Sequence, residues 1–240
     1  MKNKRVLISG ANDGIGFSCV QVLLEQGFNV HAVSRSTNNL DKIGHKNLTI
    51  VQADLLEDKS IELLLNHTDT YPPHILIANF QPEVKKKSMF RFTDEELHTQ
   101  LGLGLKYLFP LVKKALLFQK KEGFGRFIAI SSVSVKGSNK GHLLYNMQKH
   151  LLESLALQIC TELKGKGITS NIIRPGLIET EGLKKRIKQK ELVSIKTKYG
   201  NIEFGRPESI SSLVKHLVSE ESGFMNGGIY DVDGAIFLDN

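Results

Sequence analysis

Short, mostly apolar runs alternate with longer stretches of helical periodicity along almost the whole chain. We predict strands at 5–9, 28–33, 48–53, 74–79, 126–131, 168–173 and 229–232, and helices at 15–26, 58–66, 94–121, 144–164 and 207–219. Apolar strands that alternate with helices are typical of parallel sheets with right-handed crossovers. The sequence therefore predicts an α/β fold with a doubly wound parallel sheet and helices on both faces. Because no linker-like segment interrupts the pattern, we expect one domain over residues 1–240.

Three glycines follow the first predicted strand, at Gly10, Gly14 and Gly16, and a predicted helix lies directly beyond them. Glycine lets the backbone come close to a pyrophosphate, and the amino terminus of a helix favours its negative charge. A strand, a glycine turn and a helix in this order are the context that a dinucleotide fingerprint requires. The G-x-x-x-G-x-G spacing therefore favours a Rossmann-type sheet that binds a dinucleotide over an ordinary turn.

A tyrosine and a lysine lie one turn apart at the start of the predicted helix 144–164. Tyr145 precedes Lys149 by four residues, so both side chains project from one face of that helix. A nearby cation favours the phenolate, which makes a phenol usable as a general acid or base nearer neutral pH. Ser132 follows the predicted strand 126–131, where its hydroxyl could hold a carbonyl oxygen. These three residues are the candidate catalytic groups.

Six motifs in this order resemble those of the short-chain dehydrogenase/reductase family, and they extend over the whole chain. They are 9–16 (Ser-Gly-Ala-Asn-Asp-Gly-Ile-Gly), Ala53-Asp54, the set Ser132, Tyr145 and Lys149, 171–180 (Asn-Ile-Ile-Arg-Pro-Gly-Leu-Ile-Glu-Thr), 205–208 (Gly-Arg-Pro-Glu) and 231–234 (Asp-Val-Asp-Gly). Within the family, residues 167–180 are most similar to the 3-oxoacyl-acyl-carrier-protein reductases of fatty acid biosynthesis. The resemblance implies an oxidoreductase with a nicotinamide cofactor.

This resemblance implies an NADPH-dependent ketoreductase that converts a 3-oxoacyl thioester into a 3-hydroxyacyl thioester. Tyr145 would protonate the developing alkoxide, Lys149 would hold the nicotinamide ribose and lower the pKa of the tyrosine, and Ser132 would orient the carbonyl. The residues assigned to the cofactor are Gly10, Asn12, Asp13, Gly14, Ile15, Gly16, Ser34, Arg35, Asp54, Leu55, Asn79, Tyr145, Lys149, Pro175, Gly176, Ile178 and Thr180. Residues 181–204 would form a flap over the substrate. Two alternatives stay open: a carbonyl reductase or dehydrogenase of a small alcohol, sugar or secondary metabolite, and a non-catalytic dinucleotide-binding subunit.

The end of the second predicted strand bears on the choice between the two nicotinamide cofactors. An acidic residue there would select NAD, but this chain has Ser34 followed by Arg35. A guanidinium suits a 2′-phosphate in charge and in donor geometry. Asp13 in the glycine turn argues the other way, because its carboxylate could repel the same phosphate. NADP(H) is therefore the favoured cofactor and NAD(H) the alternative, while Asp54 would either hold the adenine or cap a turn.

The chain departs from the family's pattern at two places near the expected site. Residues 78–81 read Ala-Asn-Phe-Gln where relatives carry Asn-Asn-Ala-Gly, so Asn79 keeps one asparagine and Phe80 is bulky. Relatives also place an asparagine in the following helix, where it holds a water for proton relay, and Gly104 occupies that position here. Glycine offers no side chain, although Gly102 and Gly104 together could allow a kink. We therefore expect the proton donor to be retained and its supply route to be altered.

A net charge of +7 bears on partners. Lysines and arginines cluster at 85–87, 113–114, 120–121 and 184–190, and the first and last clusters lie in loops expected near the mouth of the site. An acidic acyl carrier protein would be attracted there, and solvated faces are the plain alternative. No nucleic-acid-binding motif accompanies the charge, so no nucleic acid is expected.

Other features indicate the setting of the protein. No apolar run approaches a membrane span, and Cys19 and Cys160 lie in predicted helices without metal-ligand spacing, so we expect free thiols, no metal, no membrane and a cytoplasmic location. Family members often form homotetramers through the helices expected here at 94–121 and 144–164, so a homotetramer or homodimer is expected. The apolar stripe of Leu151, Leu152, Leu155 and Ile159 would either serve that interface or face the chain's own sheet.

Overall fold

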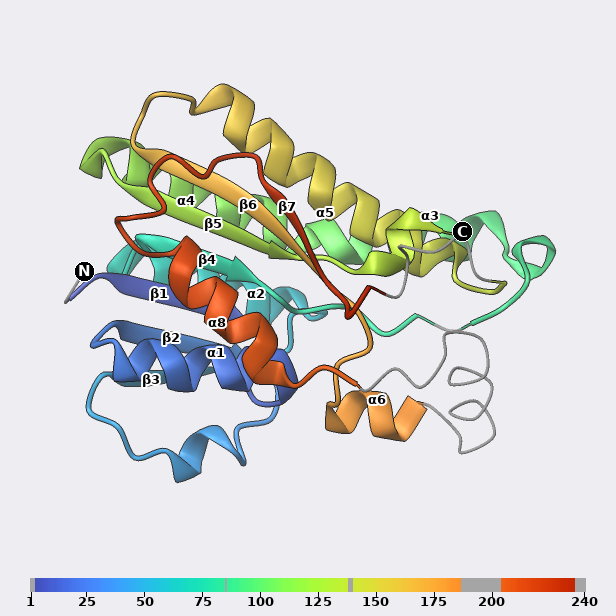
Figure 1. Cartoon of the computed structure of the whole chain (residues 1–240). Helices are drawn as coiled ribbons and strands as arrows, with labels where there is room; N and C mark the ends of the chain where they lie inside the picture. Colours follow the sequence, from blue (N-terminus) through green and yellow to red (C-terminus); the bar gives the residue numbers. More distant parts are fainter. Residues whose placement is uncertain (1–2, 85, 138–139, 187–203, 236–240) are drawn as a thin grey trace.

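In the computed structural model, which describes all residues except 1–2, 85, 138–139, 187–203 and 236–240, seven strands form one sheet (Figure 1). The order is β3-β2-β1-β4-β5-β6-β7, and every neighbouring pair is parallel. The strands are β1 (Arg5–Ser9), β2 (Asn29–Ser34), β3 (Leu48–Gln52), β4 (Ile75–Ala78), β5 (Gly125–Ile130), β6 (Ile168–Pro175) and β7 (Ile229–Val232). All seven predicted strands are confirmed, with bounds that differ by at most two residues.

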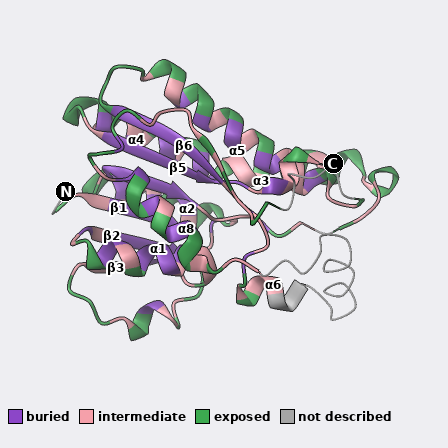
Figure 2. Ribbon diagram, viewed as in Figure 1, coloured by how far each residue is buried: buried purple, intermediate pink, exposed green. Residues whose placement is uncertain are grey.

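Helices cover both faces of the sheet, which confirms the doubly wound arrangement. They are α1 (Gly14–Glu25), α2 (Asp58–Thr70), α3 (Asp94–Lys106), α4 (Leu108–Glu122), α5 (Leu143–Glu162), α6 (Glu181–Arg186) and α8 (Pro207–Leu217). In β1, Val6 and Ile8 pack into a core shared with α1 and α8, whereas Leu7 between them packs into a second core shared with α2, α4 and α5 (Figure 1). Strands buried on both faces explain the continuous apolar runs in the sequence (Figure 2).

The predicted helix 94–121 is wrong as a single element, because the chain breaks at Tyr107 into α3 and α4. The Tyr107 ring is buried and packs edge-on against Phe80, with 5.4 Å between ring centroids. Its hydroxyl donates to the Phe80 carbonyl at 3.4 Å, and burial raises the pKa of Tyr107 to about 12. Apolar periodicity continues through the break, so the sequence alone did not reveal it. The predicted helix 58–66 is also four residues too short, since α2 ends at Thr70.

The strand order creates a switch point at the carboxyl ends of the central strands, where open α/β sheets form their ligand crevice. β1 pairs with β2 on one side and with β4 on the other, so the connections leave β1 in opposite directions. Ligands of open α/β sheets bind outside the carboxyl ends of strands at such a switch point. The predicted glycine turn follows β1, and Ser132 follows β5, so both open onto this edge.

Several further expectations can be compared with the structure. Cys19 and Cys160 are free thiols, as expected, and burial raises the pKa of Cys19 to about 12. Within the stripe on α5, Leu152 and Ile159 belong to the core against the chain's own sheet and Leu155 packs against it. None of the helices among the described residues has the length and apolarity needed to cross a membrane. Of the predicted flap 181–204, α6 covers the first six residues, and 187–203 lie outside the described residues.

Candidate active site

The glycine turn after β1 is formed by backbone that favours glycine. Gly10 and Gly14 have φ angles of +68° and +52°, in the left-handed region that other residues rarely enter. A Cβ placed on Gly16 would lie 2.1 Å from the Gly10 carbonyl oxygen. The Asn79 amide fixes the turn from β4 by donating to the carbonyls of Ser9 (3.2 Å) and Gly10 (2.9 Å). This cradle fits a pyrophosphate, because the main chain stays free of side chains where the helix begins.

Asp13 and Thr180 lie at the mouth of this turn. The Asp13 carboxylate caps α1 by accepting from the Gly14 N–H at 2.7 Å. The Thr180 side chain covers the turn from the other half of the chain, since a Cβ on Gly14 would lie 2.6 Å from Thr180 Cγ2. Thr180 Oγ1 also accepts from the Leu183 N–H at 3.1 Å, at the start of α6. The structure therefore brings together two predicted cofactor residues that the sequence separates widely.

The end of β2 carries the residues predicted to contact the adenosine. Arg35 has a side chain 78% exposed, and its guanidinium lies 3.5 Å from an Asp54 carboxylate oxygen. The other oxygen of Asp54 accepts from the Leu56 N–H at 3.1 Å, so Asp54 does cap a turn. Leu55 is buried beneath it, and Ser34 is the last residue of β2. An exposed guanidinium at this strand end can meet a phosphate from solvent.

Asn12 and Ile15 have supporting places in the turn. The Asn12 side-chain oxygen accepts from the N–H groups of Asn39 (3.0 Å) and Leu40 (3.3 Å), which fastens the turn to the short helix Leu40–Lys42. Ile15 packs against the core shared by α1 and α8. The side chains of Asn12 and Ile15 therefore support the fold. Only their backbone atoms are left to contact a ligand in the turn.

Tyr145, Lys149 and Ser132 meet where β5 ends and α5 begins. Lys149 is almost fully buried, and its Nζ donates to the Ile130 carbonyl at 2.8 Å and lies 5.8 Å from the centroid of the Tyr145 ring. Ile130 is the last residue of β5, two residues before Ser132. Ser132 Oγ accepts from the Ser134 N–H at 3.2 Å and so caps the short helix η3 (Val133–Lys136). Lys149 and Ser132 are therefore held at one strand end, and the Tyr145 ring lies beside Lys149.

The wall on the β6 side is formed by Pro175, Gly176 and Ile178. The Gly176 N–H donates to the Val232 carbonyl at 2.9 Å, and a Cβ on Gly176 would lie 2.6 Å from Asp233 Cα. Ile178 forms a bridge with Gly205, which closes the base of the segment between them. Glycine at 176 is thus required by the close approach of β7.

The two departures from the family's pattern are adjacent in space. The Gln148 side chain is buried, and its amide donates to the Gln100 carbonyl in α3 at 2.6 Å and accepts from the Gln81 amide. Gly104 lies under this side chain, since a Cβ there would be 3.7 Å from Gln148 Cγ. The Phe80 ring packs edge-on against Tyr107, between α3 and α4. An amide from α5 therefore fills the region where an asparagine of α3 was expected.

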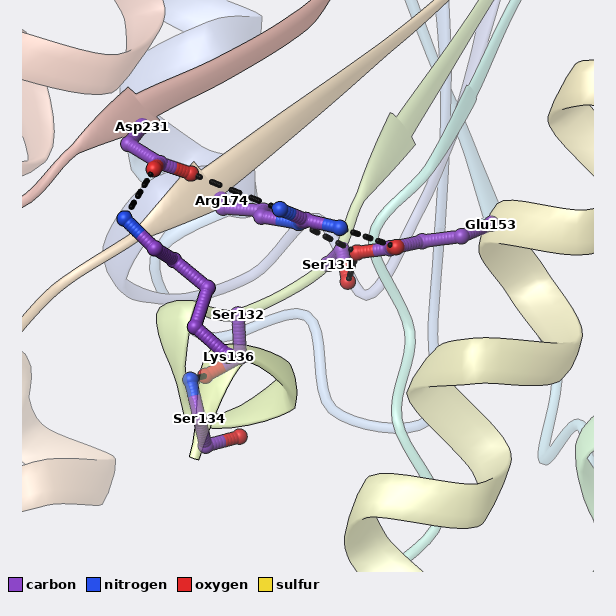
Figure 3. A network of polar contacts seen from close by, with 7 residues as sticks. All are labelled: Ser131, Ser132, Ser134, Lys136, Glu153, Arg174 and Asp231. Atoms are coloured by element: carbon purple, nitrogen blue, oxygen red, sulfur yellow. Dashed lines mark hydrogen bonds and ion pairs between the residues drawn. The ribbon is translucent and has the colours of Figure 1, made fainter. Parts of the chain in front are cut away.

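Charged residues that were not predicted as site residues lie beside the segment that carries Ser132 (Figure 3). Arg174 donates to both carboxylate oxygens of Glu153, at 2.8 and 2.7 Å, and its third nitrogen lies 3.9 Å from Asp231. Lys136 donates to Asp231 at 2.8 Å. Ser131 donates to Glu153 from the residue before Ser132. We call Glu153, Arg174, Asp231 and Lys136 the charge chain.

In the charge chain, the cost of burying charges is opposed by hydrogen bonds that favour the charged forms. Burial alone would raise the pKa of Glu153, but hydrogen bonds from Arg174 and Ser131 outweigh it and hold that pKa below its ordinary value. The hydrogen bond to Glu153 raises the pKa of Arg174 in turn. The local signals in the sequence were a carboxylate one turn beyond Lys149 on α5 and a charged residue, Arg174, within an apolar strand. The four residues come from four elements and have no characteristic spacing.

Comparison with known proteins identifies the class. The chain matches the family model described as "Enoyl-(Acyl carrier protein) reductase" over residues 10–235. This range contains the glycine turn, Ser132, Tyr145, Lys149 and the six strands β2 to β7, whereas β1 lies just before it. The chain therefore belongs to the short-chain dehydrogenase/reductase family, whose members are oxidoreductases that bind NAD(H) or NADP(H).

Individual relatives cover nearly the whole chain. The 3-oxoacyl-[acyl-carrier-protein] reductase MabA of Mycobacterium bovis is 26% identical over 239 residues, which cover 98% of this chain and 93% of that protein. FabG of Salmonella typhimurium, with the same activity in its name, is 26% identical and covers 99% of this chain and 98% of its own length. Among solved structures, a 4-hydroxyisoleucine dehydrogenase complexed with NADH has a TM-score of 0.87 at 28% identity, covering 99% of this chain and 100% of its own.

Proposed function

We propose that the protein is an NADPH-dependent ketoreductase that reduces a 3-oxoacyl thioester to a 3-hydroxyacyl thioester. The observation that carries the proposal is the anchoring of Lys149 at the end of β5, 5.8 Å from the Tyr145 ring and two residues before Ser132. A pseudo-enzyme free of selection could lose any of these three residues. The two 3-oxoacyl reductases described above support the thioester as substrate.

Each residue has a distinct task in this proposal. The Tyr145 hydroxyl donates its proton to the developing alkoxide, and the Lys149 ammonium stabilises the phenolate that remains. The Ser132 hydroxyl donates a hydrogen bond to the carbonyl oxygen and so fixes the face of the ketone. When bound, NADPH supplies the hydride. Pro175, Gly176 and Ile178 line the nicotinamide side, and the Thr180 hydroxyl remains able to donate to a carboxamide.

The preference for NADPH rests on Arg35 and Asp13. The Arg35 guanidinium is exposed at the end of β2, whereas the Asp13 carboxylate is turned to the Gly14 N–H. Because that hydrogen bond engages the carboxylate, its repulsion of a 2′-phosphate is reduced. We predict that Arg35→Ala raises the Kd for NADPH about tenfold or more, the scale of one charge-assisted contact, and leaves the Kd for NADH unchanged. Equal affinity of the unmodified protein for both cofactors would reject this preference.

The position of Lys86 supports the proposal that an acidic acyl carrier protein presents the thioester substrate. Lys86 is exposed, and a Cβ on Gly141 would lie 3.6 Å from Lys86 Cβ, which places the lysine loop beside the segment that leads into Tyr145. An acyl carrier protein would approach this positive edge. Lys87 of the same loop forms an ion pair with Glu96, and Lys85 and residues 187–190 lie outside the described residues.

We also propose a cytoplasmic homotetramer or homodimer. Apolar side chains are exposed on the outer faces of two helices, Phe109 (57%) and Leu117 (58%) on α4 and Leu143 (38%) and Leu157 (40%) on α5. Pairing of these faces between subunits would bury them. Light scattering should give a mass of at least two chains, and a monomer at micromolar concentration would contradict the assembly.

Turnover tests the proposal directly. NADPH oxidation should be measured at high enzyme concentration against 3-oxoacyl thioesters, free and carrier-bound, with simple ketones as comparisons and 3-hydroxyacyl thioesters as a control that cannot accept hydride. Carrier-bound 3-oxoacyl thioesters are expected to have the highest kcat/KM. If NADPH binds with a clear Kd and no ketone reacts, the ketoreductase proposal fails and a dinucleotide-binding subunit takes its place.

A second candidate function is the dehydrogenation or reduction of a small hydroxy or keto compound. It is favoured by the 28% identity to a 4-hydroxyisoleucine dehydrogenase, a solved structure that contains NADH. Small hydroxy acids and amino acids should therefore be included with NAD and NADH in the same assay. Faster turnover of these compounds than of any thioester would select this candidate.

A further inference from the structure

The charge chain holds both ends of the segment that carries Ser132 (Figure 3). At one end, Ser131 donates to Glu153, and its N–H donates to the Ile173 carbonyl of β6 at 2.8 Å. At the other end, Lys136 is the last residue of η3 and donates to Asp231 in β7. Arg174 joins the two ends, because it contacts both Glu153 and Asp231. The serine thus lies in a short loop closed by side chains.

We propose that the charge chain is a positioning device for the Ser132 hydroxyl, with Arg174 as its central positioning residue. The inference rests on the ketoreductase function proposed above, since it concerns the serine of that site. Arg174 does not touch the reacting atoms in this proposal. It acts through Ser131 and through the short helix η3, which together determine where the Ser132 Oγ is held.

Burial makes the inner pair of the charge chain, Glu153 and Arg174, rigid. Glu153 is 5% exposed, and the fork of Arg174 donates to both of its oxygens, the geometry that fixes orientation as well as distance. Ser131 is buried as well. The outer pair of Asp231 and Lys136 is about 30% exposed and is therefore screened by solvent. We expect the inner pair to contribute more to positioning than the outer pair.

The same arginine connects the serine to the wall of the nicotinamide side. Arg174 directly precedes Pro175 and Gly176, and Arg174 and Asp231 are register partners in the β6–β7 pairing. One turn of α5 separates Glu153 from Lys149, so the carboxylate also belongs to the helix that carries the tyrosine–lysine pair. The charge chain therefore relates three parts of the site to one another: the serine loop, α5 and the β6 wall.

A purely structural role predicts a different outcome from a positioning role. A buried ion pair is weak evidence for stability, because the desolvation of its charges offsets much of their attraction. If Arg174 only stabilised the fold, its replacement would lower activity by the same factor with or without the serine hydroxyl. If it positions that hydroxyl, its effect on turnover must vanish once the hydroxyl is removed.

A double-mutant cycle separates the two roles. Arg174→Lys retains the charge and removes the fork, and we expect kcat to fall about 10- to 100-fold, the scale of a misplacement of about 1 Å, with the Kd for NADPH unchanged. In the Ser132→Ala background, the same replacement should lower kcat less than about twofold. Equal losses of kcat in both backgrounds would overturn the proposal.

A second variant, Lys136→Met, and a measurement that needs no turnover make the test independent of the folding of Arg174→Lys. If Arg174→Lys does not fold, Lys136→Met should lower kcat about three- to tenfold with the same dependence on Ser132, since its residue is partly exposed. Hydrogen exchange of the Ser134 and Val135 amides should accelerate at least about tenfold in either variant, while amides of α1 stay unchanged. This readout holds even if no ketone is reduced, so failure of the function and failure of the inference are distinguishable.

Lys114→Met is the matched control, because Lys114 forms an ion pair with Asp69 between α4 and α2, away from the serine. It should change neither kcat nor the exchange of the Ser134 and Val135 amides. Unchanged exchange of these amides in both Arg174→Lys and Lys136→Met would overturn the proposal independently of the kinetic result.

Discussion

The two sides of the crevice are built from different parts of the chain. On the side of β1 and α1, the backbone forms the site: Gly10 and Gly14 have positive φ angles, and the main chain around Gly16 has no room for a Cβ. On the side of β5 and α5, side chains form it: Tyr145 and Lys149 lie side by side as the proposed proton donor and its cation, and the charge chain contacts the segment that carries Ser132 through Ser131 and Lys136. The first side keeps the family's pattern, and the second keeps the reactive groups but changes what supports them.

This difference shows which parts of a site can be rebuilt. A turn made of backbone accepts few substitutions, because a single Cβ at Gly16 would collide with a carbonyl. A shell made of side chains can exchange partners while the reactive groups stay in place. Gly104 and Gln148 illustrate this exchange, since loss of a side chain from α3 is accompanied by a buried amide from α5.

The largest expected effect concerns the chemistry of the side-chain half. Tyr145→Phe removes the proton donor, and we predict a loss of about 10²- to 10⁴-fold in kcat with the Kd for NADPH nearly unchanged. Steady-state kinetics and fluorescence titration measure the two quantities. Tyr71→Phe is the control, because Tyr71 is exposed and packs on His31 and His67 instead. Activity of Tyr145→Phe within a few-fold of the unmodified protein would assign the proton to another group.

The second largest expected effect comes from a substitution in the glycine turn, on the backbone side of the site. Gly16→Ala places a Cβ 2.1 Å from the Gly10 carbonyl and 2.8 Å from the Asn79 amide nitrogen, so the turn must shift. We predict a loss of NADPH affinity of about 100-fold or more, or loss of folding, measured by titration and thermal unfolding. Gly102→Ala is the contrast in α3, where the added Cβ meets open space, and it should raise the free energy of unfolding by about 0.5–1 kcal/mol. Tight NADPH binding by Gly16→Ala would show that the turn tolerates side chains.

A region remote from both sides provides a reference for stability. His31 Nδ1 lies 2.8 Å from His67 Nε2, and burial, with the charges of His67 and Arg5, lowers the pKa of His31 to about 4. The unfolded chain therefore takes up this proton near pH 6.5, before the folded protein does. Stability present above about pH 6.5 should be lost as the pH falls toward 4, by at most about 3 kcal/mol from His31.

Urea unfolding between pH 4.5 and 7.5 measures this loss. His31→Gln should flatten the pH dependence while the Kd for NADPH at pH 7.5 stays unchanged, because His31 lies away from the crevice. An unchanged pH dependence in this variant would assign the acid sensitivity to other groups, with His74 the next candidate, since burial lowers its pKa to about 4 as well.

The smallest expected effect concerns the rebuilt support. Gln148→Ala leaves the Gln100 carbonyl and the Gln81 amide without this partner, which should lower the free energy of unfolding by about 1–3 kcal/mol. Adding Gly104→Asn supplies an amide from α3, so the double variant should regain part of the stability and should not have a lower kcat than Gln148→Ala. If Gly104→Asn changes the free energy of unfolding by the same amount with Gln148 present and in the Gln148→Ala background, the two positions are not coupled.

The sequence predicted the elements whose signals are local. Seven strands were predicted because β1 to β7 are short apolar runs, and the glycine turn was predicted because a strand and a helix flank fixed glycines. The break at Tyr107 was missed because its contacts are distant in sequence: the Tyr107 hydroxyl donates to the Phe80 carbonyl, in the loop after β4. Local periodicity cannot report such a contact.

The site divides in the same way. Tyr145 and Lys149 share one helical face and were found from their spacing. Glu153, Arg174 and Asp231 come from α5, β6 and β7, so only the fold brings them together. A charged residue inside an apolar strand, such as Arg174 in β6, was the remaining local signal, and its partner could not be chosen from the sequence because several carboxylates were available.

The place of Asp231 in β7 has a consequence for the synthesis of the protein. β7 is the edge strand of the sheet and follows all the other strands along the chain, so Asp231 emerges from the ribosome after Ser132, Tyr145, Lys149 and Arg174. A nascent chain that lacks β7 has its reactive side chains but not the carboxylate that joins Arg174 to Lys136. Translation must therefore pass residue 231 before the serine loop can close, which makes maturation of the site a late event in biogenesis.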